Sequence, residues 1–241
     1  MGLQEGETQT TTTKPGARAL EILERSGLRG LPESTRHALI DGGKVERLLR
    51  RQRIAQQGEL APALFLLGKG RVKLERASSG HVFPVGHRGP GDLVGEAALT
   101  GNVAPEHAIV ADEVEALVIP ATFLRRLATT DTLLQAVVAR ALLEGQRAAE
   151  DRLASLLLRS VRARLVELLL DGLDRWGEPH RSGTALSAPF THADLASLIG
   201  STRETVTLEL GKLRRAKLIE LDRRRIVILD RDALARYAET P

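Results

Sequence analysis

One stretch of this sequence, from Thr132 to Leu158, keeps a helical pattern without a single proline. As an α-helix it spans about 40 Å at 1.5 Å per residue. Two columns alternate along it in 4-3 spacing, which suits a contact between two parallel helices. One column is Val138, Gly145 and Arg152, and the other is Leu142, Ala149 and Leu156. Gly145 and Arg152 make this seam imperfect, so two interpretations stay open: a dimer helix, or a core helix buried against its own domain.

The residue pattern before this stretch is typical of a β-rich domain. From Val45 to Ile119 it consists of short apolar runs separated by glycine and proline, which is typical of an antiparallel sandwich or roll. Hairpin or tight turns are expected at Gly68–Gly70, Ser78–Gly80 and Pro90–Asp92. Two short helices, around Ala19–Arg25 and from Pro32 to Gly43, are expected to precede the strands as a small cap.

Near the C-terminus, the segment FTHADLASLIGSTRETVTLELGKLRR predicts two short helices joined by a tight turn. Thr191 can cap the first helix, with Asp194 three residues on. Ser201 can cap the second helix, and Glu204 would complete a capping box. Gly200 allows the sharp turn between them. This is the pattern of a helix-turn-helix.

The second of these helices separates into a core face and a presented face. The expected core stripe consists of Val206, Leu210 and Leu213. Arg203 and Glu204 lie near the start of the helix, where an arginine can grip guanine O6 and N7 and a glutamate can accept from cytosine N4. Leu208 falls on the presented side, where an apolar side chain can contact a thymine methyl group. The pattern therefore favours readout of DNA bases.

Charge supports a nucleic-acid partner for this segment. The chain has 35 Lys and Arg against 31 Asp and Glu, a net charge of +4, and its pI is about 9.8. Between Arg203 and Arg225 there are eight basic and four acidic residues, so this stretch alone carries +4. The following IELDRRRIVILD predicts two strands around a basic turn, a wing that touches phosphates, although a run such as RRR by itself is usually a solvated hairpin tip. The remaining residues of the expected DNA-binding set are Ser201, Thr202, Lys212 and Arg214.

Composition excludes several other classes of protein. The 241 residues contain no cysteine, which removes disulfides, thiolate metal sites and cysteine nucleophiles. No stretch is long and apolar enough to cross a membrane and the start lacks a secretion signal, so a cytoplasmic location without membrane contact is expected. Residues 1–16 are polar and are expected to form a disordered tail.

Two motifs together resemble the cyclic-AMP receptor protein and FNR (Crp/Fnr) family of bacterial transcription regulators. They are STRETV at Ser201–Val206 and PGDLVGEAAL at Pro90–Leu99, the latter similar to the phosphate-binding cassette of cyclic-nucleotide domains. The resemblance implies an α+β fold with a cyclic-nucleotide-binding-like β-roll (a double-stranded β-helix), a long dimerisation helix and a C-terminal winged helix-turn-helix. The corresponding boundaries are residues 17–130, 131–158 and 159–241. It also favours the homodimer over the buried core helix.

The sensor pocket departs from the cyclic-AMP-binding members of that family. Gly95, Glu96 and Ala97 keep the start of the cassette, but Glu106 and His107 stand where those members carry an arginine that pairs with the cyclic phosphate. A carboxylate at 4 Å from a phosphate costs about 1 kcal/mol in water and several times that in a partly buried site. Ordinary cyclic-AMP binding is therefore doubtful, and the purine contact of the dimer helix is also missing. A polar pocket, an anionic effector held by Arg147 or Arg152, and regulation without any effector all remain open, with a preference for the last.

These observations predict a homodimeric regulator that reads a palindrome and, as is commoner in the family, activates transcription by touching RNA polymerase. The rival interpretation is an architectural protein that coats DNA without sequence preference. Motifs for hydrolases, zinc proteases, P-loops and dinucleotide sites are absent, so we expect no enzyme activity, no cofactor and no metal. His81 and His87 are expected to be surface residues, because Pro84 interrupts their strand.

Overall fold

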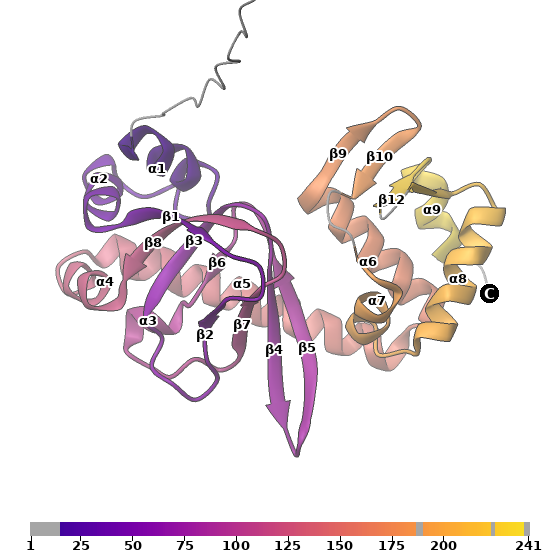
Figure 1. Cartoon of the computed structure of the whole chain (residues 1–241), viewed down its shortest axis with the longest axis horizontal. Helices are drawn as coiled ribbons and strands as arrows, with labels where there is room; N and C mark the ends of the chain where they lie inside the picture. Colours follow the sequence, from indigo (N-terminus) through magenta and orange to yellow (C-terminus); the bar gives the residue numbers. More distant parts are fainter. Residues whose placement is uncertain (1–14, 187–189, 223–224, 239–241) are drawn as a thin grey trace, which may run out of the picture.

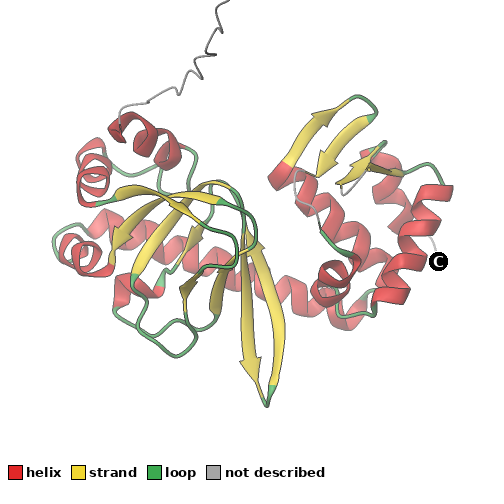
Figure 2. Ribbon diagram, viewed as in Figure 1, coloured by secondary structure: helices red, strands yellow, loops and turns green. Residues whose placement is uncertain are grey.

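The computed structural model of the protein describes residues 15–186, 190–222 and 225–238. A β-rich unit and a mainly helical unit lie at the two ends of one long helix, as Figure 1 shows. The helical unit carries a small sheet of its own beside its helices (Figure 2). No helix among the described residues is long and apolar enough to cross a membrane.

Two four-stranded antiparallel sheets form the roll of the first unit. In spatial order, the first sheet contains β1 (Lys44–Leu48), β8 (Val114–Pro120), β3 (Ala63–Lys69) and β6 (Leu93–Val94). The second contains β2 (Arg53–Ala55), β7 (His107–Val110), β4 (Val72–Ser78) and β5 (His81–Arg88). The short helix α3 (Ala97–Thr100) follows β6. The predicted roll is confirmed.

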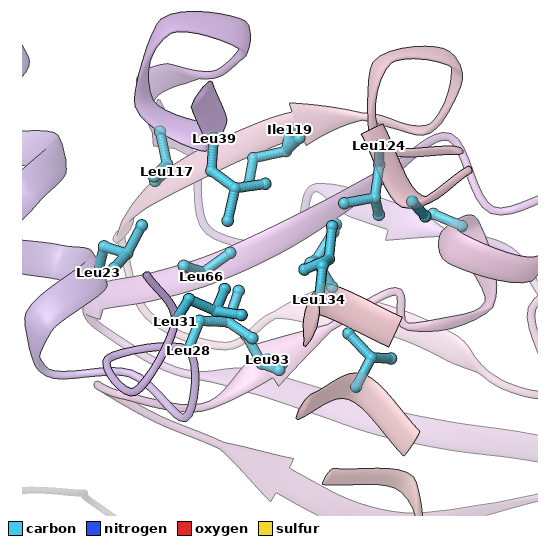
Figure 3. Close-up of a cluster of buried hydrophobic side chains, with 14 of the residues drawn as sticks. Leu23, Leu28, Leu31, Leu39, Leu66, Leu93, Leu117, Ile119, Leu124 and Leu134 are labelled. Atoms are coloured by element: carbon cyan, nitrogen blue, oxygen red, sulfur yellow. The ribbon is translucent and has the colours of Figure 1, made fainter. Parts of the chain in front are cut away.

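Both faces of β3 are buried, which explains its continuous apolar run. Successive side chains of a strand point to opposite faces, so Leu64 and Leu66 pack toward the helices while Phe65 and Leu67 pack between the two sheets. The helices on the first face are α1 (Pro15–Glu24), α2 (Glu33–Gly42), α4 (Ala121–Ala128) and the start of α5 (Thr132–Leu158). Figure 3 shows this cluster, with Leu66 lying among leucines from those helices. Each buried leucine contributes about 1.5–3 kcal/mol.

The hairpin turns fall where glycine predicts them. Between β3 and β4, Gly70 has φ +78°, and a Cβ at this position would lie 2.0 Å from the carbonyl oxygen of Glu113. Between β4 and β5, Ser79 and Gly80 both have positive φ, as a two-residue turn of the primed type requires. The long β4–β5 hairpin extends beyond the rest of the roll (Figure 1).

The N-terminal expectation is modified. Helix α1 begins at Pro15, inside the segment expected to be a disordered tail, and residues 1–14 lie outside the described part of the chain.

Helix α5 has the predicted bounds, but in one column of the predicted seam only Gly145 is exposed, and the other two residues are not available to a second helix. Val138 is buried in the core of the roll, and the Arg152 guanidinium donates to the carbonyl oxygens of Val85 and Leu198. Both residues are engaged within their own chain because the helix packs against both units, which periodicity alone does not reveal. In the other column Leu142 and Ala149 are exposed, and Leu156 is half-buried.

The second unit begins with α6 (Val161–Trp176) and continues with β9 (Gly177–His180), β10 (Gly183–Leu186), α7 (His192–Leu198), α8 (Arg203–Arg215), β11 (Ile219–Asp222), β12 (Arg225–Ile228) and α9 (Arg231–Ala238). Its strands form one antiparallel sheet in the order β11-β12-β10-β9. The two wing strands β11 and β12 are confirmed, whereas their basic turn at residues 223–224 lies outside the described residues. The hairpin β9–β10 was not predicted, because GEPH is polar and largely exposed.

Candidate nucleic-acid interface

The predicted cap of helix α7 is confirmed, and it has the geometry of a capping box. The Thr191 hydroxyl accepts from the backbone nitrogen of Asp194 at 3.1 Å, and the Asp194 carboxylate accepts from the backbone nitrogen of Thr191 at 3.0 Å. After the helix, Gly200 takes φ +60°, a left-handed conformation that glycine adopts without strain. The turn between α7 and α8 therefore forms as the sequence predicts.

The cap of α8 differs from the prediction. Thr202, not Ser201, has the extended cap conformation, and its hydroxyl accepts from the backbone nitrogen of Thr205 at 3.2 Å. Ser201 belongs to the preceding turn, because its backbone nitrogen donates to the carbonyl oxygen of Ala196 at 2.9 Å. The helix starts one residue later than expected, so Glu204 is not part of a capping box.

The two faces of α8 are as the helical wheel predicts. Val206, Leu210 and Leu213 are each at most 1% exposed. Arg203 and Glu204 are exposed in the first turn of the helix. Leu208 follows on the outer face, and this apolar side chain is 54% exposed. Donor, acceptor and apolar side chains are thus presented together, which is the set that base edges of a major groove require.

A second polar pair extends this face and escaped the sequence reasoning. The Thr207 hydroxyl donates to the carbonyl oxygen of Arg203 at 2.8 Å and lies 2.8 Å from Nδ1 of the half-buried His192, the first residue of α7. Thr207 follows Arg203 by one helical turn, so the wheel could have identified it. His192 reaches the face only through the packing of α7 on α8.

Lys212 and Arg214, two of the expected DNA-binding residues, have different surroundings. Lys212 Nζ lies 2.6 Å from Oε1 of Glu209, which is only 7% exposed. The other oxygen of Glu209 lies 3.5 Å from Nε of Arg162 on α6. Arg214, in contrast, is exposed in the last turn of α8. Lys212 is therefore part of a half-buried ion pair, while Arg214 faces solvent.

The sensor cassette begins with a glycine that the backbone requires. Gly95 has φ +86°, and a Cβ there would lie 2.3 Å from the carbonyl oxygen of Ala63. Glu96 follows at the cap position of α3, whose first residue, Ala97, is half-buried. Burial raises the pKa of the Glu96 carboxyl above its usual range, against the opposing effect of the Arg88 charge on β5. A second carboxylate, Glu106, also raises it.

The carboxylate expected to exclude a phosphate already has a partner. Arg76 Nη2 on β4 lies 3.3 Å from Oε2 of Glu106. The neighbouring His107 accepts at Nδ1 from the backbone nitrogen of Gln57 at 3.1 Å. Arg147 is exposed on α5. Glu96 and Glu106 are thus neighbours of arginines from β5 and β4.

The expectation of two surface histidines is right for His81 and wrong for His87. Strand β5 continues through Pro84 with a register shift opposite Leu74 and Glu75, and His87 is only 8% exposed. Its ring meets that of Phe190 edge to face at 5.4 Å between centroids. Burial, and after it the charge of Arg71, lowers the pKa of His87 to about 4. Among the described residues, no group of three or more His, Asp or Glu side chains is arranged to hold a metal ion.

Comparisons with known proteins agree with both units. A cyclic nucleotide-binding domain matches residues 45–131, and a Crp-like helix-turn-helix domain matches residues 151–237. The chain is 31% identical to the global nitrogen regulator of Synechococcus elongatus, over 80% of this chain and 88% of that protein. It is 27% identical to the CRP-like cAMP-activated global transcriptional regulator of Mycobacterium tuberculosis, over 90% of this chain and 99% of that protein.

Solved structures show the same fold. FixK2 from Bradyrhizobium japonicum superposes with a TM-score of 0.72 at 19% identity, over 83% of this chain and 98% of that one. A CRP-family transcriptional regulator from Thermus thermophilus superposes with a TM-score of 0.66 at 29% identity, over 81% and 97%. With the roll, the long helix and the helix-turn-helix in this order, the chain belongs to the Crp/Fnr family of DNA-binding transcription regulators.

Proposed function

We propose that the protein is a homodimeric, sequence-specific regulator that reads a palindromic DNA site through α8 of each subunit. The observation that carries this proposal is the exposure of Arg203 and Glu204 in the first turn of α8 and of Leu208 one turn later. The stripe of the same helix that contains Val206, Leu210 and Leu213 is fully buried. Arginine and glutamate together match the two bases of a G·C pair. An architectural protein needs only phosphate contacts, and an acidic side chain in the groove weakens such binding.

The proposed dimer forms along α5. Its exposed leucines include Leu142, Leu153 and Leu157, which are 48%, 57% and 74% exposed. At 100° per residue they fall with Ala149 within one stripe of the helix. The spacing from Leu142 to Ala149 to Leu156, with Leu153 between the last two, follows the heptad rule for two parallel helices. A second copy of α5 would cover these side chains.

Two-fold symmetry then defines the DNA site. Two copies of α8 would enter successive major grooves, with half-sites about 34–36 Å apart along the duplex. Phosphate contacts would come from Arg214 and from the hydroxyls of Ser201 and Thr202, which lie at the start of the same helix. For the effect on transcription, we propose activation by contact with RNA polymerase, the commoner behaviour in this family.

For the sensor pocket, we propose that no cyclic nucleotide is needed for DNA binding. Glu106 stands where the cyclic-AMP-binding members carry the arginine that pairs with the phosphate, and its carboxylate pairs with Arg76. A buried or half-buried carboxylate opposes a phosphate. The relative from Mycobacterium tuberculosis is described as cAMP-activated, so the two proteins would differ in this respect.

The test is selection from random duplex DNA by the purified chain with no effector added, at near-physiological salt. Enrichment of a palindrome with half-sites one helical turn apart is expected. Salt-sensitive binding without enrichment would favour an architectural role. If a palindrome is enriched only after a small molecule is supplied, the proposal that no effector is needed is overturned. The proposal of a sequence-specific regulator would then still hold.

A further inference from the structure

The second unit packs against the roll through a small set of aromatic and cationic side chains. Phe190, just before α7, lies with its ring beside His87 of β5 and 6.2 Å from the Trp176 ring at the end of α6. The Arg71 guanidinium lies 5.3 Å from the centre of the Phe190 ring. Phe190 is therefore enclosed by two residues of the roll and one of its own unit.

The Trp176 indole also reaches the roll. A Cβ built on Gly89, immediately after β5, would lie 2.3 Å from the indole nitrogen. Only a glycine lets the tryptophan approach the backbone this closely. Gly89 is buried, and the neighbouring Arg175 lies 4.0 Å from Asp92 of the turn that follows.

Arg152 connects the same two parts from the long helix. One guanidinium nitrogen donates to the carbonyl oxygen of Val85 on β5 at 2.5 Å, and another donates to the carbonyl oxygen of Leu198 at the end of α7 at 2.5 Å. Arg152 is partly buried, and burial lowers the pKa of its guanidinium. A charged group is held in such a place when its donors are satisfied. Arg152 of α5 thus forms hydrogen bonds to both the roll and the helix-turn-helix.

We propose that these contacts form a clamp between β5 and the DNA-binding unit, and that the clamp holds α8 in the orientation in which the dimer reads DNA. The clamp consists of Arg71, His87, Arg152, Trp176 and Phe190. The part of this inference that concerns DNA affinity rests on the proposed function. The part that concerns the existence of the clamp does not. Because Arg203, Glu204 and Leu208 stay exposed while the clamp is closed, the closed arrangement does not block the reading face.

Trp176 is the only tryptophan of the chain, so the full-length protein carries its own probe. We would measure acrylamide quenching of its fluorescence together with affinity for the selected palindrome, in wild type, Arg152→Ala and Phe190→Ala. The matched control is Arg140→Ala, an exposed arginine of α5 that pairs with Glu144 on the same helix. Gly89→Ala is a further variant that disturbs the clamp from the roll side.

Opening the clamp should expose Trp176 and remove the preorganisation of α8. We expect quenching to rise and affinity for the palindrome to fall about tenfold in the clamp variants, as is typical when a binding element loses its fixed orientation. Arg140→Ala should match wild type in both readouts. Thermal unfolding followed by circular dichroism identifies any variant that fails to fold, and the remaining variants then decide the outcome.

Two results would contradict the clamp proposal, and a third would contradict only the proposed function. Unchanged quenching in all folded clamp variants would mean that the clamp is not formed in solution. Increased quenching with unchanged or tighter DNA binding would mean that it does not hold α8 for reading. If wild type itself selects no palindrome, the proposed function fails, while the quenching measurement still decides whether the clamp exists.

Discussion

Lys212 Nζ lies 2.6 Å from the carboxylate of Glu209, one turn back on α8, and Glu209 is only 7% exposed. The pair stabilises the inner side of the helix that carries the reading face. The ammonium group of Lys212 is therefore already paired within the protein, unlike that of a solvated lysine on a phosphate-binding surface.

Lys212→Ala should for this reason lower the stability of the protein. It leaves a buried carboxylate with one fewer donor, which costs about 1–3 kcal/mol. Urea unfolding of Lys212→Ala against Arg214→Ala would measure the difference, since Arg214 is exposed at the same end of the helix. An equal free energy of unfolding for both variants would contradict this assignment.

Arg203→Ala should reduce sequence preference. The loss of a bidentate contact to guanine is expected to cost about 1–3 kcal/mol per half-site and to relax the preference at one base pair. Arg214→Ala should instead weaken all duplexes alike and reduce the salt slope by about 1. Titrations of the selected palindrome and its single-base variants at several salt concentrations distinguish the two. Equal, sequence-independent losses would remove the base-reading role from Arg203.

Leu153→Glu should convert the protein to monomers. Leu153 is 57% exposed within the stripe that contains Leu142 and Ala149, and a second helix packed there would bury the new charge at considerable cost. Leu158→Glu is the control, because Leu158 is 84% exposed at the same end of α5 but falls on the opposite side of the helical wheel. Analytical ultracentrifugation should give a monomer for the first and a dimer for the second. A dimer in both cases would place the contact elsewhere.

Acidification should destabilise the folded protein through His87. Burial first, and then the Arg71 charge, lowers its pKa from 6.5 to about 4. Lys73 acts in the same direction, while Asp194 and Asp112 oppose it. Because the unfolded chain binds the proton more readily, the stabilisation is complete above pH 6.5 and is lost as the pH falls toward 4, a change of about 3 kcal/mol.

The variant His87→Gln isolates this contribution. Glu96 has a raised pKa and so contributes with the opposite sign, but it is present in both proteins and cancels in the comparison. The free energy of unfolding should fall less steeply between pH 7 and pH 4.5 in His87→Gln than in wild type. Parallel curves would show that His87 is not buried in solution.

Changing the charge at position 106 should change the response to cyclic AMP. Glu106 opposes a phosphate, whereas an arginine would pair with it. At about 1 mM cyclic AMP, we expect no shift in the thermal midpoint of wild type and the largest increase in Glu106→Arg, with Glu106→Gln between them. A clear increase in wild type would contradict our account of the pocket.

The sequence could predict those features that depend on neighbouring residues. The two faces of α8 follow from the spacing of Val206, Leu210 and Leu213, and the turns at Gly70 and Gly80 follow from the need for positive φ. The N-cap residue of α8 is harder to predict from the sequence, because the side chains of Ser201 and Thr202 can both cap a helix. The bond from Ser201 to Ala196 in the preceding turn decides between them.

The features that escaped prediction depend on contacts between distant parts of the chain. His87 is buried by Phe190 of the other unit, and no local pattern around His87 indicates that contact. Arg152 fits the helical periodicity of α5 as a seam residue, yet its donors go to β5 and α7. Glu106, just before β7, likewise pairs with Arg76 of β4, which is distant in the sequence.

The most direct test of the central claim compares affinities for two duplexes at about 150 mM salt, without effector: the selected palindrome and a scrambled sequence of the same composition. For a regulator that reads bases through Arg203 and Glu204, the account predicts a preference of about 10³-fold or more for the palindrome. Equal affinity for both duplexes would contradict it and leave only phosphate binding.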